Sequence, residues 1–432
     1  MDRSAPRNRH GRRSVRLALP GLIFLLSTWA PPLSALGFTG PLVIPAVLLS
    51  RLVVPGTPPA SVASQNAPGT AKGGSKWSDK IVLSGLVAGD GRWRSTGTGP
   101  TAAKTTDLYL RTLEIGIEAG FADWVSATVV LNSEYIGDPL NGADSGVVVD
   151  EAHVDIAVPH TPVYFIVGKR TQFFGLFDNH FVTDPLVQDA YETKVVGLTA
   201  GVKAPLSSDL SWTFYKGRVQ SDHLAQSGLF DPDPGTVPQA GADRVDSWIL
   251  SSSASPAGET WTVFAALASE PGIGRRMTAL NLGTNLAVPG IKHVQIDAEV
   301  MRGLGREDVP GLGRPFRESA LSFTASYQIV SRPRTEIGGR SYLARKIHRL
   351  AHPVEAGVRF EAFDDGGRAA ALGSWSVRNR VSLGGRYTFF ERENTQAAMS
   401  LEYRRQTLRI SPLYTGAAGS GHEVYVRVGL DF

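Results

Sequence analysis

The C-terminal stretch Glu423-Val-Tyr-Val-Arg-Val-Gly-Leu-Asp-Phe432 alternates between polar and apolar side chains without a break. Successive side chains of a β-strand leave opposite faces, so this period of two predicts a strand with one apolar and one polar face. About ten residues is also the length that a tilted strand needs to cross a bilayer. The stretch predicts either a strand of a membrane barrel or an edge strand of a soluble sandwich.

Composition permits both architectures. The chain has 432 residues, of which 42% are hydrophobic and 19% charged, and it has no Cys. This length suits two or three soluble domains, or one membrane barrel with many short strands and polar loops. The lack of Cys excludes disulfides and thiolate metal sites.

The N-terminal region carries the basic charge of the chain. Residues 1–64 contain seven Arg, no Lys and one acidic residue, Asp2, which is a net charge of +6. Subtracting this from the total of +4 leaves 4 − 6 = −2 for the rest, so the basic pI does not indicate nucleic-acid binding. The Arg-rich start and the apolar run 17–30 predict a secretory leader within residues 1–64, its cleavage site open, with a retained helical anchor as the alternative. Residues 65–79 are predicted to be disordered.

Alternating patterns fill residues 80–432, and the segments between them sort by length. Segments after odd-numbered strands are mostly long and those after even-numbered strands mostly short, as in outer-membrane barrels with short periplasmic turns and long outer loops. The exception is 331–352. As a long turn it gives sixteen strands, and as an extra hairpin eighteen. We therefore predict an all-β fold, a transmembrane antiparallel β-barrel of sixteen strands with eighteen as the alternative, and no nucleic-acid partner.

The polar faces of these strands would line a wet lumen. The predicted basic lining residues are Arg359, Arg378, Arg380, Arg386, Arg404 and Arg427. The predicted acidic ones, on strands expected at the opposite wall, are Glu114, Glu118, Glu134, Glu151 and Asp155. Such a layout would set a field across the pore and draw anions. The alternative is that these charges simply balance one another.

The segment 173–193 contains four Phe within nine residues, which is too apolar for a solvated outer loop. We expect it to fold into the barrel and narrow the pore as a constriction loop. Its candidate residues are Phe173, Phe174, Phe177, Asp178, His180, Phe181 and Asp184. One His among scattered acids is a weak metal signal, so we predict no metal, no cofactor and no catalytic residues.

Several motifs in residues 77–200 resemble one family of porins. They are Trp77-Ser-Asp-Lys-Ile-Val-Leu-Ser-Gly-Leu86, Asp123-Trp-Val-Ser-Ala127, Val149-Asp-Glu-Ala152, Gly168-Lys-Arg170, Phe174-Gly-Leu-Phe177, Thr183-Asp-Pro-Leu186 and Glu192-Thr193. Together they resemble the LbtU-type siderophore porins, which are related to phosphate-selective and carbohydrate porins. The chain lacks the coiled-coil segment that several members carry before the barrel. The resemblance implies a sixteen-stranded porin for a ferric siderophore or another small anionic solute.

These observations predict a porin of the bacterial outer membrane rather than an enzyme. Expected partners are outer-membrane lipid, small polar or anionic solutes with a ferric siderophore as one candidate, the barrel assembly machinery and further copies in a homotrimer. A general, carbohydrate or phosphate porin is the first alternative, and an outer-membrane enzyme or a structural barrel the second. A TonB-driven receptor is excluded, because a barrel of about 22 strands and its plug need more residues.

Overall fold

The computed structural model describes residues 81–97, 103–138, 146–177, 179–205, 207–230, 244–272, 274–291, 293–308, 313–329, 354–392, 395–414 and 419–432. The predicted leader 1–64, the predicted disordered segment 65–79, residues 331–352 and Asp178 lie outside these ranges.

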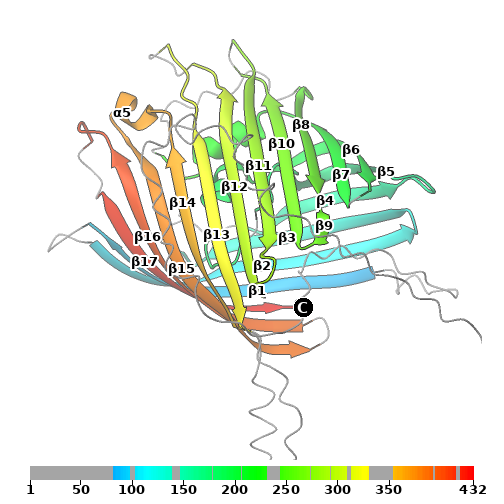
Figure 1. Ribbon diagram of the computed structural model, residues 1–432, viewed down its shortest axis with the longest axis horizontal. Coiled ribbons are helices and arrows are strands. Elements are labelled where there is room, and N and C mark those ends of the chain that lie inside the picture. The colour runs from blue at the N-terminus through cyan, green and yellow to red at the C-terminus, as the bar shows by residue number, and fades with distance from the viewer. Residues whose placement is uncertain are drawn as a thin grey trace, which may run out of the picture. The chain divides into compact units, whose positions relative to one another are not determined.

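Sixteen antiparallel strands close into one barrel (Figure 1). In chain order they are β1 (Ile81–Thr96), β2 (Ala103–Ala122), β3 (Val125–Ile136), β4 (Val148–Ala157), β5 (Val163–Thr171), β6 (Lys194–Ala204), β7 (Ser208–Tyr215), β8 (Ser247–Ala254), β10 (Trp261–Glu270), β11 (Met277–Ala287), β12 (Val294–Gly305), β13 (Ser319–Ile329), β14 (Val354–Asp364), β15 (Trp375–Arg392), β16 (Thr395–Ile410) and β17 (Ser420–Asp431). A short strand, β9 (Pro256–Glu259), lies outside the ring. The prediction of sixteen strands is confirmed. The alternative of eighteen is wrong, because β13 and β14 pair directly with each other.

The C-terminal strand closes the ring. β17 pairs with β16 on one side and with β1 on the other, which leaves no open sheet edge to face lipid. Its alternation holds in space: Glu423 and Tyr425 are buried inside, whereas Val426 and Val428 are exposed outside. The terminal Phe432 packs over Gly85 of β1, where an added Cβ would lie 2.4 Å from the Phe432 ring. On the outer face, where β17 meets β1, Phe432 and Gly85 therefore fit each other in shape.

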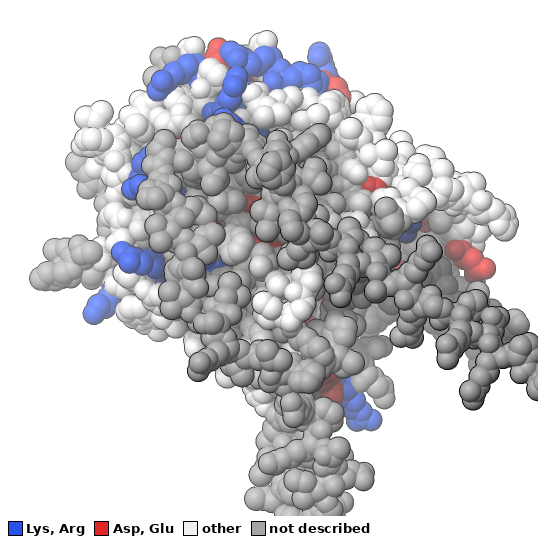
Figure 2. Space-filling model, viewed as in Figure 1, with Lys and Arg blue, Asp and Glu red and all other residues white. Residues whose placement is uncertain are grey.

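The outer surface of the barrel is apolar. Large side chains such as Val196, Leu383 and Leu401 point outward and are more than half exposed, at 65%, 53% and 54%. The wall visible in Figure 2 is mostly uncharged, and Lys and Arg gather at the rim that carries the helix α5 (Arg368–Leu372). A closed barrel with an apolar outside satisfies its backbone hydrogen bonds within hydrocarbon. The chain is a barrel of the bacterial outer membrane.

The two ends of the barrel differ. The connections that join β2 to β3 and β15 to β16 are tight turns, whereas those after β5, β7 and β14 are long and contain the helices α2 (Leu186–Tyr191), α3 (Val219–Gln226) and α5. In Figure 1, α5 marks the rim with the long loops, and the C-terminus lies toward the opposite rim. None of the helices in the described ranges is long and apolar enough to cross a membrane.

Candidate functional site in the barrel lumen

The connection between β5 and β6, residues 172–193, makes hydrogen bonds across the barrel. The backbone N–H groups of Leu176, Thr183 and Leu186 donate to carboxylates of Glu299 on β12 (2.9 Å), Glu402 on β16 (2.7 Å) and Glu361 on β14 (2.5 Å). In the ring, β14 is eight strands from β5 in either direction. Since these carboxylates stand on the polar inner face, segment 172–193 lies against the inside of the wall opposite its own strands.

Arg359 of β14 joins this segment to the wall. Its guanidinium pairs with Glu361 at 3.1 Å and with Glu402 at 3.5 Å, and all three side chains are fully buried. It also donates to Thr183 Oγ1 (2.9 Å) and to Asn179 Oδ1 (3.2 Å). Buried charges of this kind are stable only when paired and hydrogen-bonded. Arg359 is thus a structural clamp, enclosed between the segment and the wall.

His180 forms a second clamp. Its Nδ1 lies 2.6 Å from Glu355 Oε1 on β14, and its Nε2 lies 2.7 Å from Asp297 Oδ2 on β12. Burial alone would disfavour the imidazolium, but the two carboxylate hydrogen bonds outweigh it and raise the pKa of His180 to about 10. His180 is therefore charged at neutral pH, and neither ring nitrogen is free to bind a metal.

The Phe residues of the segment have different surroundings. Phe174 is fully buried in an apolar cluster, against which Phe177 packs. Phe181 lies over two inner-face glycines, Gly357 and Gly384, where added Cβ atoms would come within 3.2 Å and 2.6 Å of its ring. Phe173 instead lines a cavity on the other wall, with the Arg170 guanidinium 4.0 Å from its ring centre.

A second loop also fills the lumen, and the sequence analysis missed it. After β7, α3 begins where the N–H groups of Gln220 and Ser221 donate to Glu270 of β10 at 2.8 and 2.9 Å. Its Leu224 joins α2 in the cluster that contains Phe174. The cluster also includes inner-face side chains of β6 to β8 and β10 to β15, among them Val195, Tyr215, Ile249, Phe264, Ala266, Met301, Ala320 and Phe363. The flanking stretch is rich in Gly, Pro and Asp, which hid this apolar signal.

The predicted basic residues are mostly paired with neighbouring acids. Arg380 contacts Asp189 of the segment at 2.6 Å, Arg386 lies 3.6 Å from Asp431, Arg404 donates to Glu423 at 2.7 Å, and Arg427 to Asp90 at 2.7 Å. Their charges are therefore compensated at short range.

Arg378 departs from the expected alternation. The register between β15 and β16 shifts between Val377 and Asn379, so Arg378 has no partner in the ladder and its side chain is exposed. A β-bulge of this kind re-aims the side chains around it. Strand parity therefore does not place Arg378 beside Arg380, and its role in the pore remains a prediction.

Only some of the predicted acidic residues face the arginines across the pore. In the ring, β2 is separated from β17 by β1 alone, whereas β4 lies seven strands from β14, one short of directly opposite. The placement on an opposite wall is therefore wrong for β2, because closure brings the first and last strands together, and it holds approximately for β4 relative to Arg359 on β14. Glu134 lies 3.2 Å from Arg111, Thr171 donates to Glu151, and Asp155 lies 3.2 Å from His153. Glu114 is half-buried and Glu118 is exposed.

Segment 172–193 also contributes an acidic residue, Asp184, which faces these strands. Asp184 lies 3.5 Å from Arg111, an inward residue that the period-two pattern missed because the register between β1 and β2 shifts from Leu110 to Thr112. Burial and the nearby Asp189 raise the pKa of Asp184, while Arg111, Arg427 and Arg359 oppose this. The side chains of Asp184, Glu134 and Arg94 are partly buried, and they border the part of the lumen that the two loops leave unfilled.

Comparison with solved structures assigns the architecture. The chain superposes on the outer membrane channel DcaP of Acinetobacter baumannii with a TM-score of 0.54 and 12% identity, covering 82% of this chain and 97% of that one. Its fold is that of a porin. An anion-selective porin from Comamonas acidovorans gives a TM-score of 0.52 at 12% identity over 82% and 99% of the chains. Salmonella typhi OmpF, in complex with daunomycin, gives 0.52 at 12% identity over 83% and 99%.

Sequence comparison does not refine this porin fold further. No protein-family model matches the chain, and no curated protein matches it. The resemblance of residues 77–200 to the LbtU-type siderophore porins is not confirmed.

Proposed function

We propose that this protein is a passive porin for small polar solutes. The observation that carries the proposal is the division of the lumen: two loops pack against an apolar cluster that draws on β6 to β8 and β10 to β15, while charged and hydroxyl side chains line the wall that the cluster leaves free. A polar interior beside a folded-in loop suits diffusion of hydrated solutes, because such solutes need neither a dry pocket nor a reactive group. Segment 172–193 is the proposed constriction loop.

The ion preference follows from the pairing of the charges. Lone arginines would draw anions, whereas an arginine held at a carboxylate presents little net charge to a passing ion. We expect weak selectivity. Replacing Arg378, Arg380 and Arg386 together by Ala, which leaves Asp189 and Asp431 without their arginines, should shift the reversal potential in a salt gradient toward cations. An unchanged reversal potential would remove these arginines from the selectivity filter.

Transport of a ferric siderophore is the finer form of the proposal, and it rests on the motifs in residues 77–200. Single-channel conductance in a planar bilayer, with and without a ferric siderophore, tests both forms. Stable conductance that the siderophore blocks supports the specific channel, and conductance that ignores it supports a general porin. A protein that does not conduct would overturn the proposal.

Assembly is proposed on the same grounds. We propose insertion by the barrel assembly machinery, for which the terminal Phe432 and the alternation of β17 are the expected signal, and a homotrimer as the working state. Native mass spectrometry of the protein extracted from outer membranes should show three chains, and a single chain would overturn the trimer.

A further inference from the structure

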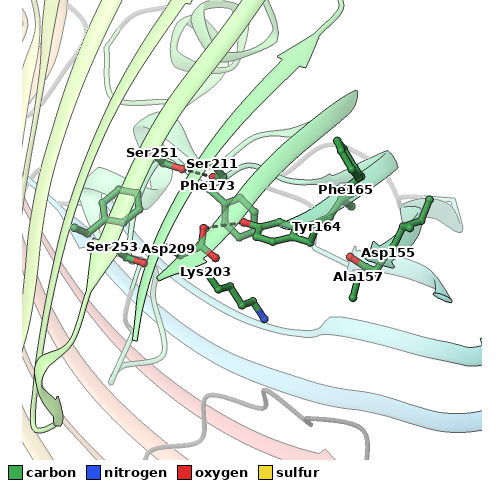
Figure 3. Close-up of a pocket in the computed structure, with 13 residues that line it drawn as sticks. Asp155, Ala157, Tyr164, Phe165, Phe173, Lys203, Asp209, Ser211, Ser251 and Ser253 are labelled. Atoms are coloured by element: carbon green, nitrogen blue, oxygen red, sulfur yellow. Dashed lines mark hydrogen bonds between the residues drawn. The ribbon is translucent and has the colours of Figure 1, made fainter. Parts of the chain in front are cut away.

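A cavity of about 300 Å³ opens on the inner wall near the turns of the short-loop rim, with Phe264 of the apolar cluster at its border. It lies between the lower ends of β4 to β8 and the start of β10, and Phe173 reaches it from segment 172–193 (Figure 3). Its polar lining is Asp155, Tyr164, Lys203, Asp209, Ser211, Ser251 and Ser253. None of these groups except Asp155 belongs to the predicted lumen charges.

Tyr164 is the centre of this lining. Its hydroxyl donates to Asp209 Oδ1 at 2.8 Å, and in Figure 3 its ring lies between Asp155 and Asp209. The ring lies flat on Gly201 of β6, where an added Cβ would be 2.1 Å from the ring. The glycine thus creates the space that holds the aromatic ring against the wall.

Several polar groups around the ring still have hydrogen-bonding capacity. Among the described residues, the Ser253 hydroxyl has no hydrogen-bond partner, and the Lys203 ammonium forms no ion pair and lies 5.9 Å from the Tyr164 ring centre. The hydroxyls of Ser211 and Ser251 share one hydrogen bond of 2.7 Å, in which only one of them donates. The two hydroxyls together therefore keep unused hydrogen-bonding capacity. Carboxylate oxygens can only accept, the ammonium can only donate, and hydroxyls do both.

This mixture selects against a solute with a net charge. An anion would be repelled by Asp155 and Asp209. A cation would be repelled by Lys203, and the Arg170 guanidinium on the Phe173 ring is close by. A neutral molecule with many hydroxyls can donate to the carboxylates and accept from the ammonium at once. Its C–H faces can pack on the Phe173, Tyr164 and Phe264 rings.

We propose that this cavity is a binding site for a neutral polyhydroxylated solute of about the size of a monosaccharide. A volume of about 300 Å³ is at the small end of ligand pockets, too small for a ferric siderophore. The site lies on the short-loop side of segment 172–193, so a solute would reach it after passing the segment. This inference deepens the proposed porin function, but binding can be measured without conduction.

Equilibrium dialysis of the detergent-solubilised full chain with radiolabelled glucose tests the site. We expect saturable binding that weakens roughly tenfold in Asp209→Asn, which loses the charged acceptor, and several-fold in Ser253→Ala. Ser252→Ala is the matched control, because the neighbouring side chain is on the outer face of β8 and should leave binding unchanged. No saturable binding of glucose, or equal binding by all three variants, would overturn the proposal.

Two charged probes test the solute class. Choline, a cation, and benzoate, an anion, added as competitors, should leave bound glucose unchanged up to tenfold higher concentration, and displacement by either would overturn the neutral class. Planar-bilayer conductance separates the two proposals. Conductance without glucose binding removes the site and keeps the porin, whereas glucose binding without conductance keeps the site and removes the porin.

Discussion

The two halves of the lumen differ in what covers the inner face of the barrel wall. Along β6 to β8 and β10 to β16, two loops cover the wall and bury an apolar cluster around Phe174, Leu186 and Tyr191. Along β17 and β1 to β5, the inner face keeps charged and hydroxyl groups, and the cavity around Tyr164 lies where this part of the wall meets the cluster. One half resembles the core of a soluble protein and the other a solvated channel wall.

The carboxylates explain how the filled half holds its loops. Glu299, Glu361 and Glu402 each accept backbone N–H groups from segment 172–193, which would otherwise be unsatisfied once the loop leaves water. Buried carboxylates on the barrel wall thus accept the hydrogen bonds that water would accept from a free loop. In the open half, comparable acids such as Asp90 and Glu423 pair with arginines of the wall itself. The same residue type serves loop docking in one half and charge balance in the other.

Breaking the Arg359 clamp should give the largest effect. Arg359→Ala leaves Glu361 and Glu402 buried without their cation, which should cost about 3–5 kcal/mol of unfolding free energy. Urea unfolding of the folded barrel in lipid vesicles measures it. The control is Arg386→Ala on the adjacent strand, because the Arg386 side chain is 41% exposed and losing its ion pair with Asp431 should cost about 0–1 kcal/mol. Equal losses in both variants would refute the special role of Arg359.

Removing apolar volume from the filled half should come next. Leu186→Ala opens a cavity at a side chain with no exposure, and large-to-small changes in such cores cost about 2–5 kcal/mol. Leu413→Ala is the comparison, because this Leu is 81% exposed in a loop and should change little. The same unfolding assay applies, and a Leu186 variant as stable as wild type would mean that the two loops do not form a packed core.

Crowding the Phe181 contact should have a smaller effect. A Cβ at Gly384 would lie 2.6 Å from the Phe181 ring, and overpacking of this kind costs about 1–3 kcal/mol. Gly384→Ala should therefore loosen segment 172–193, seen as increased open-channel current noise. Gly429→Ala on β17 is the control, since the nearest atom there is 3.9 Å away. Quiet current in Gly384→Ala would show that Phe181 does not anchor the segment.

Much of this comparison could be predicted from sequence, and the limits are physical. Alternation predicted the strands and the inner placement of Arg404 and Arg427, because a period of two is a property of the strand itself, and the lengths of the connections predicted sixteen strands or eighteen. Alternation failed at Arg111 and Arg378, where register shifts break the period. The wall that faces a given charge depends on ring closure, and the partner of a loop depends on tertiary contacts. Neither ring closure nor a tertiary contact can be recognised from a local sequence pattern. The second loop, whose Leu224 completes the apolar cluster, was therefore not predicted.

The smallest expected effect concerns His180, because the other loop contacts persist when it is lost. Its pKa of about 10 exceeds the ordinary 6.5, so the docked loop holds the proton more tightly than the free loop does. The contribution of His180 to docking is therefore complete below about pH 6.5, declines as pH rises, and is lost above pH 10. We expect open-channel current noise to rise between pH 7 and pH 10. In His180→Gln, which cannot titrate, the noise should be higher at pH 7 and should lack this component of the pH dependence. If both proteins respond to pH alike, the filled half does not depend on the His180 imidazolium, and the buried carboxylates with Arg359 hold the loop alone.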